Sequence, residues 1–136
     1  MPQTYSNQKI MKIALIAHDG KKAEMVHFLS GFKEKLRGIS LVATGTTGNH
    51  IVKAGFEVQK VLSGPIGGDA QIAAMAAQKE LDLVIFFRDP LGKHPHEPDV
   101  QMLMRICDVH NIPLATNLAT AELIFQQLTT PLNNGN

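Results

Sequence analysis

The sequence predicts an α/β fold of three layers, in which helices cover both faces of a doubly wound, flavodoxin-like sheet of about five parallel strands. Short apolar runs alternate with segments whose apolar residues recur at helical spacing along the whole chain, which is typical of parallel sheets. No internal repeat is present, and 136 residues suffice for one domain. We expect a polar N-terminal extension over residues 1–9, a single domain over 10–128, and a flexible C-terminal tail over 129–136.

The expected strands are the short, mainly apolar runs at residues 10–17, 40–43, 83–87 and 113–115, and residues 57–62, where apolar and polar residues loosely alternate. Between them lie the helical patterns. The first is a stripe of apolar residues at helical spacing, with Gly38 as its stop signal; the stripe consists of Met25, Phe28, Leu29, Phe32 and Leu36. An Ala-rich helix is expected over residues 69–79, another helix opens at Asp99, and the last runs from about residue 120 to 128.

Charge and cysteine content narrow the class of protein. Lys and Arg total 13 against 12 for Asp and Glu, for a formal charge of +1, so nothing favours nucleic acid or an anionic membrane as partner. Cys107 is the only cysteine and lies on the apolar face of a helix with Leu103, which predicts a buried thiol in a reducing compartment. The apolar run 13–17 is too short for a signal sequence or a membrane span. We expect a cytoplasmic protein.

Polar and glycine-rich clusters follow the carboxyl end of every expected strand. In an open parallel sheet, ligands bind beyond these ends. The clusters, in strand order, are His18 with Asp19, residues 44–48, residues 63–69, residues 88–99, and Thr116 with Asn117. Loops on the opposite edge, such as 37–40 and 79–82, are ordinary turns. This asymmetry predicts an active site at one edge of the sheet.

The cluster at residues 44–48 reads Thr-Gly-Thr-Thr-Gly and leads from a strand into a helix. Backbone N–H groups and hydroxyls at a helix N-terminus can surround an oxyanion, which suits a phosphate monoester; a Thr-capped helix is the alternative. Neither the Walker loop nor the dinucleotide fingerprint is present. Ser63 and Gly64 can add a hydroxyl and an amide, and Lys22 can add a charge, unless it is simply an exposed lysine.

The cluster at residues 63–69 reads Ser-Gly-Pro-Ile-Gly-Gly-Asp. Its glycines and proline have almost no side chain to pack, so a tight path around a ligand explains the segment better than core formation does. Asp69 is the only acid there, at the expected start of a helix. It is either a functional carboxylate or an N-capping aspartate.

Residues 94–99 place two imidazoles and two carboxylates close together. The two prolines and the lack of a second ligand pair elsewhere argue against a metal, so we expect no metal site. His96 is instead a candidate catalytic imidazole, and Asp99 suits the cap of the next helix. Asp89 is expected to be a buried carboxylate on the rim of the site, or to form the turn before Pro90.

A phosphate-binding site, a carboxylate base and a neutral imidazole are what proton abstraction next to a carbonyl requires. A carboxylate is a weak base in water, but a closed site that stabilises the developing enediolate supplies much of the needed stabilisation. The substrate expected from these residues is a small phosphorylated ketone.

Six blocks in the same order closely resemble the methylglyoxal synthase family. They are His18-Asp19, residues 43–48, 63–69, 86–91, 95–99 and 112–121, and the resemblance extends over residues 12–126. It implies a methylglyoxal synthase-like fold and a lyase that converts dihydroxyacetone phosphate into methylglyoxal and inorganic phosphate without metal or organic cofactor. It also implies a homo-oligomer, typically a hexamer, and inhibition by phosphate.

The resemblance assigns roles to individual residues. Asp69 matches the general base, and His96 matches the imidazole that polarises the substrate oxygens. Asp19 and Asp99 match residues that orient or ionise the site. The remaining matches concern substrate and phosphate binding: His18, Lys22, Thr44, Gly45, Thr46, Thr47, Ser63, Gly64 and Asp89.

One departure separates this sequence from the family pattern. Family members usually carry an arginine after the last helix that reaches a neighbouring subunit's phosphate, and this sequence has no arginine after Arg105. We therefore expect phosphate affinity and phosphate-linked communication between subunits to differ.

Two other functions occur on similar folds: an effector-binding module like the regulatory domain of carbamoyl phosphate synthetase, and a cyclohydrolase acting on a purine intermediate. An effector-binding module does not require Asp69 and His96 together, and the block at residues 63–69 argues against the cyclohydrolase.

Overall fold

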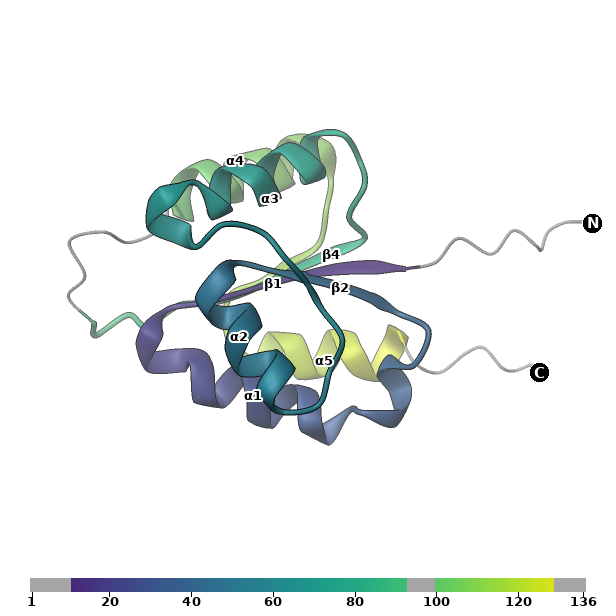
Figure 1. Cartoon of the computed structure of the whole chain (residues 1–136). Coiled ribbons are helices and arrows are strands. Elements are labelled where there is room, and N and C mark those ends of the chain that lie inside the picture. Colours follow the sequence, from purple (N-terminus) through teal and green to yellow (C-terminus); the bar gives the residue numbers. More distant parts are fainter. Residues whose placement is uncertain (1–10, 93–99, 129–136) are drawn as a thin grey trace, which may run out of the picture.

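The computed structural model describes residues 11–92 and 100–128. Its centre is a parallel sheet of five strands in the order β3-β2-β1-β4-β5 (Figure 1). The strands are β1 Lys12–Ala17, β2 Ser40–Ala43, β3 Gln59–Lys60, β4 Leu83–Phe87 and β5 Leu114–Ala115. The helices are α1 Lys22–Gly31, α2 Gly45–Lys53, α3 Gly68–Ala77, α4 Val100–His110 and α5 Leu118–Leu128. Short 3-10 turns lie at η2 Asp19–Lys21, η3 Glu34–Leu36 and η4 Gly64–Ile66.

Helices cover both faces of the sheet. Figure 1 shows α1, α2 and α5 on one face and α3 with α4 on the other. The predicted three-layer, doubly wound α/β class is therefore confirmed. The strand order 3-2-1-4-5 differs from the 2-1-3-4-5 of flavodoxin itself. It places the switch point, where the chain changes direction across the sheet, between β1 and β4.

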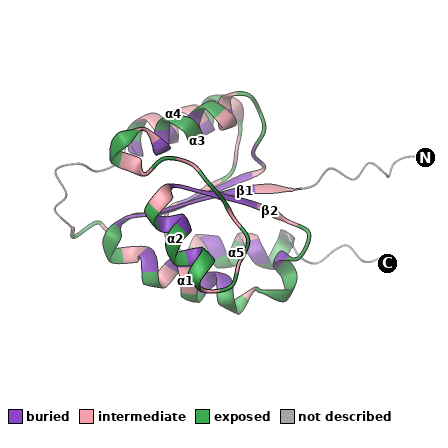
Figure 2. Ribbon diagram, viewed as in Figure 1, coloured by how far each residue is buried: buried purple, intermediate pink, exposed green. Residues whose placement is uncertain are grey.

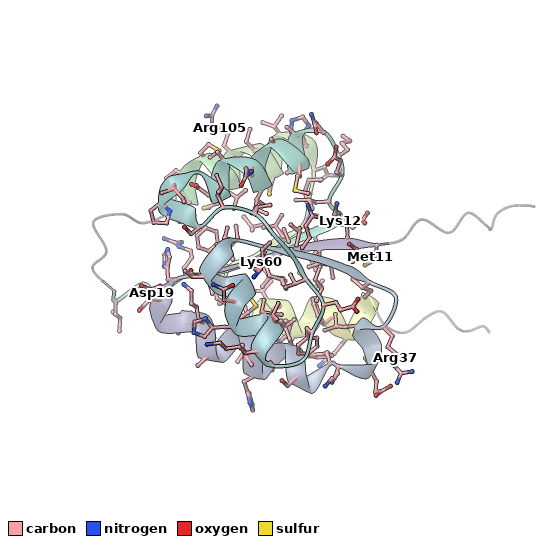
Figure 3. All side chains as sticks on the ribbon, viewed as in Figure 1. Met11, Lys12, Asp19, Arg37, Lys60 and Arg105 are labelled. Carbon is pink, nitrogen blue, oxygen red and sulfur yellow. The ribbon has the colours of Figure 1, made fainter. Side chains whose placement is uncertain are left out.

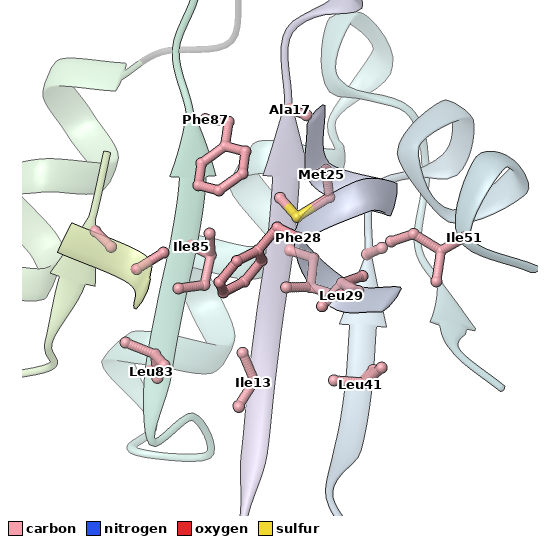
Figure 4. Packing of buried hydrophobic residues seen from close by; sticks show 14 of the residues in the cluster. Ile13, Ala17, Met25, Phe28, Leu29, Leu41, Ile51, Leu83, Ile85 and Phe87 are labelled. Carbon is pink, nitrogen blue, oxygen red and sulfur yellow. The ribbon is translucent and has the colours of Figure 1, made fainter. Parts of the chain in front are cut away.

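Alternation along β1 divides the core between the two faces. Ile13 and Leu15 pack with α1, α2 and α5, whereas Ala14 and Ile16 pack with α3 and α4. The strands are buried while the outer faces of the helices are exposed (Figure 2), as expected for a sheet covered on both sides. On the α1 face, Phe28 lies between β1, β4 and α5 (Figure 4), with its ring centroid 4.6 Å from that of Phe125.

The strand predictions hold at the centre of the sheet and shorten toward its edges. Residues 40–43 and 83–87 are strands with the predicted limits. The predicted strand 57–62 is reduced to Gln59–Lys60, which pairs only with the end of β2. The Val61 N–H still donates to the Ala43 carbonyl of β2 (2.9 Å). From Leu62 on the backbone bonds elsewhere: the Leu62 N–H donates to Gln71 Oε1 (2.8 Å) and the Leu62 carbonyl accepts from the Gly45 N–H (3.2 Å). The end of this strand has become part of a loop.

Two helices differ from their predicted limits. The first helix is predicted to include Leu36, but α1 ends at Gly31 and Leu36 lies on the separate turn η3. Glycine disfavours helix continuation. The last helix begins two residues before residue 120, because Asn117 Oδ1 accepts the Thr120 N–H (3.0 Å) and caps it. The helix after residue 68 has nearly its predicted extent.

Several predictions lie outside the described residues. They are the N-terminal extension 1–9, the start of the first strand at Ile10, the C-terminal tail 129–136, and the segment 93–99 with His96 and Asp99. Within the described part, no helix is long and apolar enough to cross a membrane.

The predicted buried thiol is confirmed. Cys107 is fully buried against the α3 side of the sheet. Burial, together with the neighbouring charge of Asp108, raises the pKa of its thiol to about 11.

We expect Cys107 to resist alkylation in the native protein. At pH 8, a pKa near 11 leaves about one thiol in a thousand ionised, and only the thiolate reacts. Modification by iodoacetamide at pH 8 should therefore be at least about a hundredfold slower in buffer than in denaturant. Similar rates in the two conditions would contradict the buried placement.

Candidate active site

The switch point between β1 and β4 holds His18. Its backbone N–H donates to the Phe87 carbonyl (3.1 Å), and its ring meets the Phe86 ring edge-on at 5.3 Å. Its Nδ1 atom accepts the Asp89 backbone N–H (2.9 Å). A neutral imidazole that accepts at Nδ1 carries its proton on Nε2. The two loops that leave β1 and β4 are thus tied together through one buried imidazole.

Asp89 is half-buried and forms a turn. Its Oδ1 accepts the Leu91 N–H (3.2 Å), so the turn-forming role predicted as an alternative is confirmed. Its other carboxylate oxygen occupies the space that a Cβ at Gly20 would take. The carboxylate therefore lies against η2, directly beside the loop that carries His18 and Asp19.

On its β2 side, the last residue of β1 is bonded by side chains instead of by a strand. β2 pairs with β1 only as far as Leu15, so the Ala17 backbone extends beyond the end of β2. The Ala17 N–H donates to Thr47 Oγ1 (3.2 Å), and the Ala17 carbonyl accepts from Thr47 Oγ1 (3.3 Å) and from Lys22 Nζ (2.9 Å). One residue thus joins the start of α1 to the first turn of α2.

Lys22 is buried, so the alternative of an exposed lysine is wrong. Its ammonium bonds the Ala17 carbonyl and Asp19 Oδ1 (2.8 Å), which accounts for two of its three donors. The Asp19 side chain is 81% exposed and the Lys22 side chain 8%. Figure 3 shows Asp19 at the opposite end of the sheet from Met11 and Lys12. Lys22 is therefore a buried cation held at the predicted edge, and its third N–H bonds no residue in the described ranges.

The threonines at the start of α2 do not all face a ligand. The Thr44 hydroxyl donates to Thr47 Oγ1 (3.3 Å), and the Gly45 N–H donates to the Leu62 carbonyl (3.2 Å). Thr44 occupies the cap position without a side-chain capping bond. Because the first N–H groups of a helix have no partner within it, those of Thr46 and Thr47 remain for an anion, together with the exposed Thr46 hydroxyl.

Asp69 is the second residue of α3 and is 8% exposed. The N-cap position belongs to Gly67, whose φ of 115° lies in the left-handed region that favours glycine. The alternative of a capping aspartate is therefore wrong. The Ser63 carbonyl accepts the N–H groups of Ile66 (3.1 Å) and Gly68 (2.9 Å), so the loop reaches Asp69 by a path closed with backbone bonds.

Residues 62–63 lie between the starts of α2 and α3. On one side, a Cβ at Gly45 would stand 3.2 Å from the Ser63 nitrogen. On the other side, a Cβ at Gly68 would overlap the Leu62 carbonyl oxygen. Only glycines allow both helices to approach this segment. The predicted phosphate-binding residues and the predicted base are consequently carried by two helix N-termini packed against the same stretch of backbone.

The structure brings most of the predicted site residues to one edge. His18, Lys22 and Asp89 meet around the ends of β1 and β4, while residues 44–47, Ser63, Gly64 and Asp69 meet around Leu62. His96 and Asp99 lie outside the described residues, and their roles stay predictions. Within the described ranges no group of three His, Cys, Asp or Glu side chains could hold a metal ion.

Sequence reasoning missed the internal bonds of this edge. The Ala17–Thr47 contact joins residues 30 positions apart, and no periodicity or motif signals it. The sequence predicts Leu62 as part of a strand, so it gives no sign that the Leu62 carbonyl accepts the Gly45 N–H. Only the density of glycines and threonines pointed to close backbone approach here.

Comparison with known proteins settles the family. A model described as "MGS-like domain" matches residues 24–116. The chain belongs to the methylglyoxal synthase family. Among curated members, the methylglyoxal synthase of Geobacillus thermodenitrificans is 59% identical over 87% of this chain and 83% of its own length. That of Lysinibacillus sphaericus is 57% identical over 87% and 89%. The crystal structure of the methylglyoxal synthase from Elizabethkingia anophelis superposes with a TM-score of 0.83 at 46% identity, covering 90% of this chain and 79% of that one.

The Gly68→Ala substitution should destabilise the protein and displace the start of α3. The new Cβ would meet backbone rather than a flexible side chain, and such overpacking costs about 1–3 kcal/mol of unfolding free energy. Urea unfolding measures the loss. Gly31→Ala is the matched control, because a Cβ there meets no atom within 4 Å, and it should leave stability unchanged or slightly raised. Equal stabilities of the two variants would contradict the packing described.

Two neighbouring threonines should respond differently to removal of the hydroxyl. Thr47→Val leaves both backbone groups of Ala17 without that partner, and we expect a loss of about 1–3 kcal/mol in unfolding free energy. Thr46→Val alters an exposed residue, so stability should stay within about 0.5 kcal/mol of the parent while phosphate binding weakens. Thermal unfolding and phosphate titration of both variants measure this contrast. Equal loss of stability would contradict the Ala17 contact.

Proposed function

We propose that this chain converts dihydroxyacetone phosphate to methylglyoxal and inorganic phosphate. The observation that carries the proposal is the placement of a buried carboxylate, Asp69, at the start of α3, against the same backbone segment as the start of α2. Such an arrangement suits a base that acts on a small molecule whose anionic group is held by α2. Membership of the methylglyoxal synthase family supports the same reaction.

The substrate's phosphate is held at the first turn of α2. Its oxygens accept the N–H groups of Thr46 and Thr47, the Thr46 hydroxyl and the remaining N–H of Lys22. Ser63 and Gly64 add a hydroxyl and an amide from the neighbouring loop. The positive end of the α2 dipole and the ammonium of Lys22 both favour a dianion at this point.

Asp69 acts as the general base. It removes a proton from the hydroxymethyl carbon, and the released electron pair forms a carbon–carbon double bond while the carbonyl oxygen becomes an enediolate oxygen. His96 polarises the substrate oxygens and moves a proton between them, and Asp19 and Asp99 orient the site. His18 Nε2–H is a further donor positioned by the Asp89 backbone.

Phosphate then leaves from the enediolate. Electrons from the enediolate form a new double bond to the carbon that carries the phosphate as the bridging C–O bond breaks and phosphate leaves. The resulting enol gains a proton on that carbon and loses its hydroxyl proton to give methylglyoxal. If the phosphate is held so that this C–O bond lies out of the enediolate plane, orbital overlap favours expulsion; an in-plane bond favours reprotonation. The geometry of the phosphate-binding residues therefore decides the product.

The assembly and regulation follow from the same proposal. We propose a homo-hexamer in the cytoplasm, with inorganic phosphate as product and inhibitor. Family membership and the buried, reduced thiol of Cys107 support these assignments. Light scattering should return the mass of six 14.8 kDa chains.

The decisive substitution is Asp69→Asn. Without the base, release of methylglyoxal from dihydroxyacetone phosphate should fall by about a hundredfold to ten-thousandfold, while affinity for inorganic phosphate is retained. Methylglyoxal and phosphate are both quantified, since the lyase must release them in equal amounts. Asp108→Asn, which alters an exposed carboxylate on α4, is the control and should keep full activity.

Other results would point elsewhere. Normal turnover by the Asp69→Asn variant would contradict the assigned base. Phosphate binding without any turnover by the unaltered protein would indicate an effector-binding module.

A further inference from the structure

A second hollow lies beside the proposed active site, at the carboxyl ends of β4 and β5. It is a pocket of about 310 Å³ between these strand ends and the start of α1. Its lining consists of Lys21, Glu24, Phe87, Arg88, Pro90, Thr116 and Asn117. None of the residues proposed to hold the phosphate, and not Asp69, belongs to it. Arg88 follows the fourth strand, and Thr116 and Asn117 follow the fifth. The proposed reaction uses none of these three residues, and they line one pocket.

Positive charge in this pocket is poorly neutralised by the protein. The Arg88 backbone is fixed by its N–H bond to the Thr116 carbonyl (3.4 Å), but its guanidinium forms no ion pair with any residue in the described ranges. Lys21 meets Glu24 at 3.5 Å, with side chains 30% and 34% exposed, and such pairs contribute little. Two cations therefore face one carboxylate.

Uncharged donors complete the lining. Asn117 Oδ1 is occupied by the Thr120 N–H, which leaves its amide NH₂ group to donate, and Thr116 adds a hydroxyl. Phe87 and Pro90 supply apolar surface. An arginine fork, an amide donor and a hydroxyl beside an apolar wall suit a molecule with a carbon skeleton and an anionic end.

We propose that this pocket binds a small organic anion, through a carboxylate or a phosphate monoester, and that it is separate from the phosphate-binding residues of the active site. Arg88 provides the principal contact. The volume of about 310 Å³ falls at the lower end of the range for small-molecule sites, so it accommodates several carbon atoms as well as the anionic group.

The pocket is placed to influence catalysis. Arg88 immediately precedes Asp89, whose N–H bonds His18 Nδ1. Lys21 immediately precedes Lys22, which bonds Ala17 and Asp19. An anion held between Arg88 and Lys21 would restrain both loops of the active site, so the bound anion acts as an effector. This last step rests on the proposed function, whereas the binding itself does not.

Equilibrium dialysis of the whole protein tests the binding. The probes are radiolabelled succinate, a four-carbon dicarboxylate, and inorganic phosphate, each used alone and with the other in excess. The variants are Arg88→Gln and, as control, Arg37→Gln, which alters a 79% exposed arginine near the opposite end of the sheet from Asp19 (Figure 3). Arg88→Gln should weaken at least one probe by about tenfold or more, since it removes a charge-assisted contact; Arg37→Gln should not.

The outcomes separate cleanly. Loss of succinate binding with retained phosphate binding identifies a carboxylate site, and loss of one of two phosphate sites identifies a phosphate-monoester site. Equal binding of both probes by the parent and the Arg88→Gln variant overturns the proposal. So does a parent protein that binds only one phosphate per chain and no succinate, if Thr46→Val abolishes that phosphate binding. If the protein releases no methylglyoxal, the dialysis still reports on the pocket. If the protein is active and the bound anion does not change its rate of methylglyoxal release, only the effector role is overturned.

Discussion

The main chain of Ala17 is the point on which the active-site edge depends. β1 is the central strand and runs two residues past the end of its pairing with β2. The N–H and carbonyl groups of Ala17, which lie beyond that pairing, bond the hydroxyl of Thr47 and the ammonium of Lys22. A buried peptide group without a partner is costly, so these bonds hold the starts of α1 and α2 in fixed positions. The cation and the amides of the phosphate site are thereby set by the sheet itself.

A second constraint positions Asp69, the proposed base. Residues 62–63 separate the starts of α2 and α3, and glycines at positions 45 and 68 let both helices contact that backbone. Asp69 follows directly and is buried. Rigid placement matters for this chemistry, because a weak carboxylate base acts on a carbon acid only when the reacting groups are held close and correctly oriented. The two backbone contacts favour that rigidity.

Much of this could be predicted from the sequence, for identifiable reasons. Residues 41–43 and 83–87 are apolar runs in strands that have a neighbouring strand on each side, and apolar runs between turns locate such strands well. The predicted strand 57–62 is longer than the observed Gln59–Lys60, and at its end Leu62 bonds Gly45 and Gln71 instead of a strand. Motif composition located the active-site edge, but not the bonding within it. The hydroxyl of Thr47 was predicted to bind phosphate, whereas it bonds Ala17, a contact between residues far apart in the chain that local pattern does not reveal.

A crystal structure with a planar enediolate mimic of dihydroxyacetone phosphate bound tests the central claim most directly. The account predicts the phosphate group on the amides of Thr46 and Thr47 and on Lys22 Nζ. It also predicts an Asp69 carboxylate oxygen within about 3 Å of the mimic's planar group, since a base must come within hydrogen-bond reach of the proton it takes. A phosphate bound away from the start of α2, or an Asp69 side chain directed away from the mimic, would contradict the account.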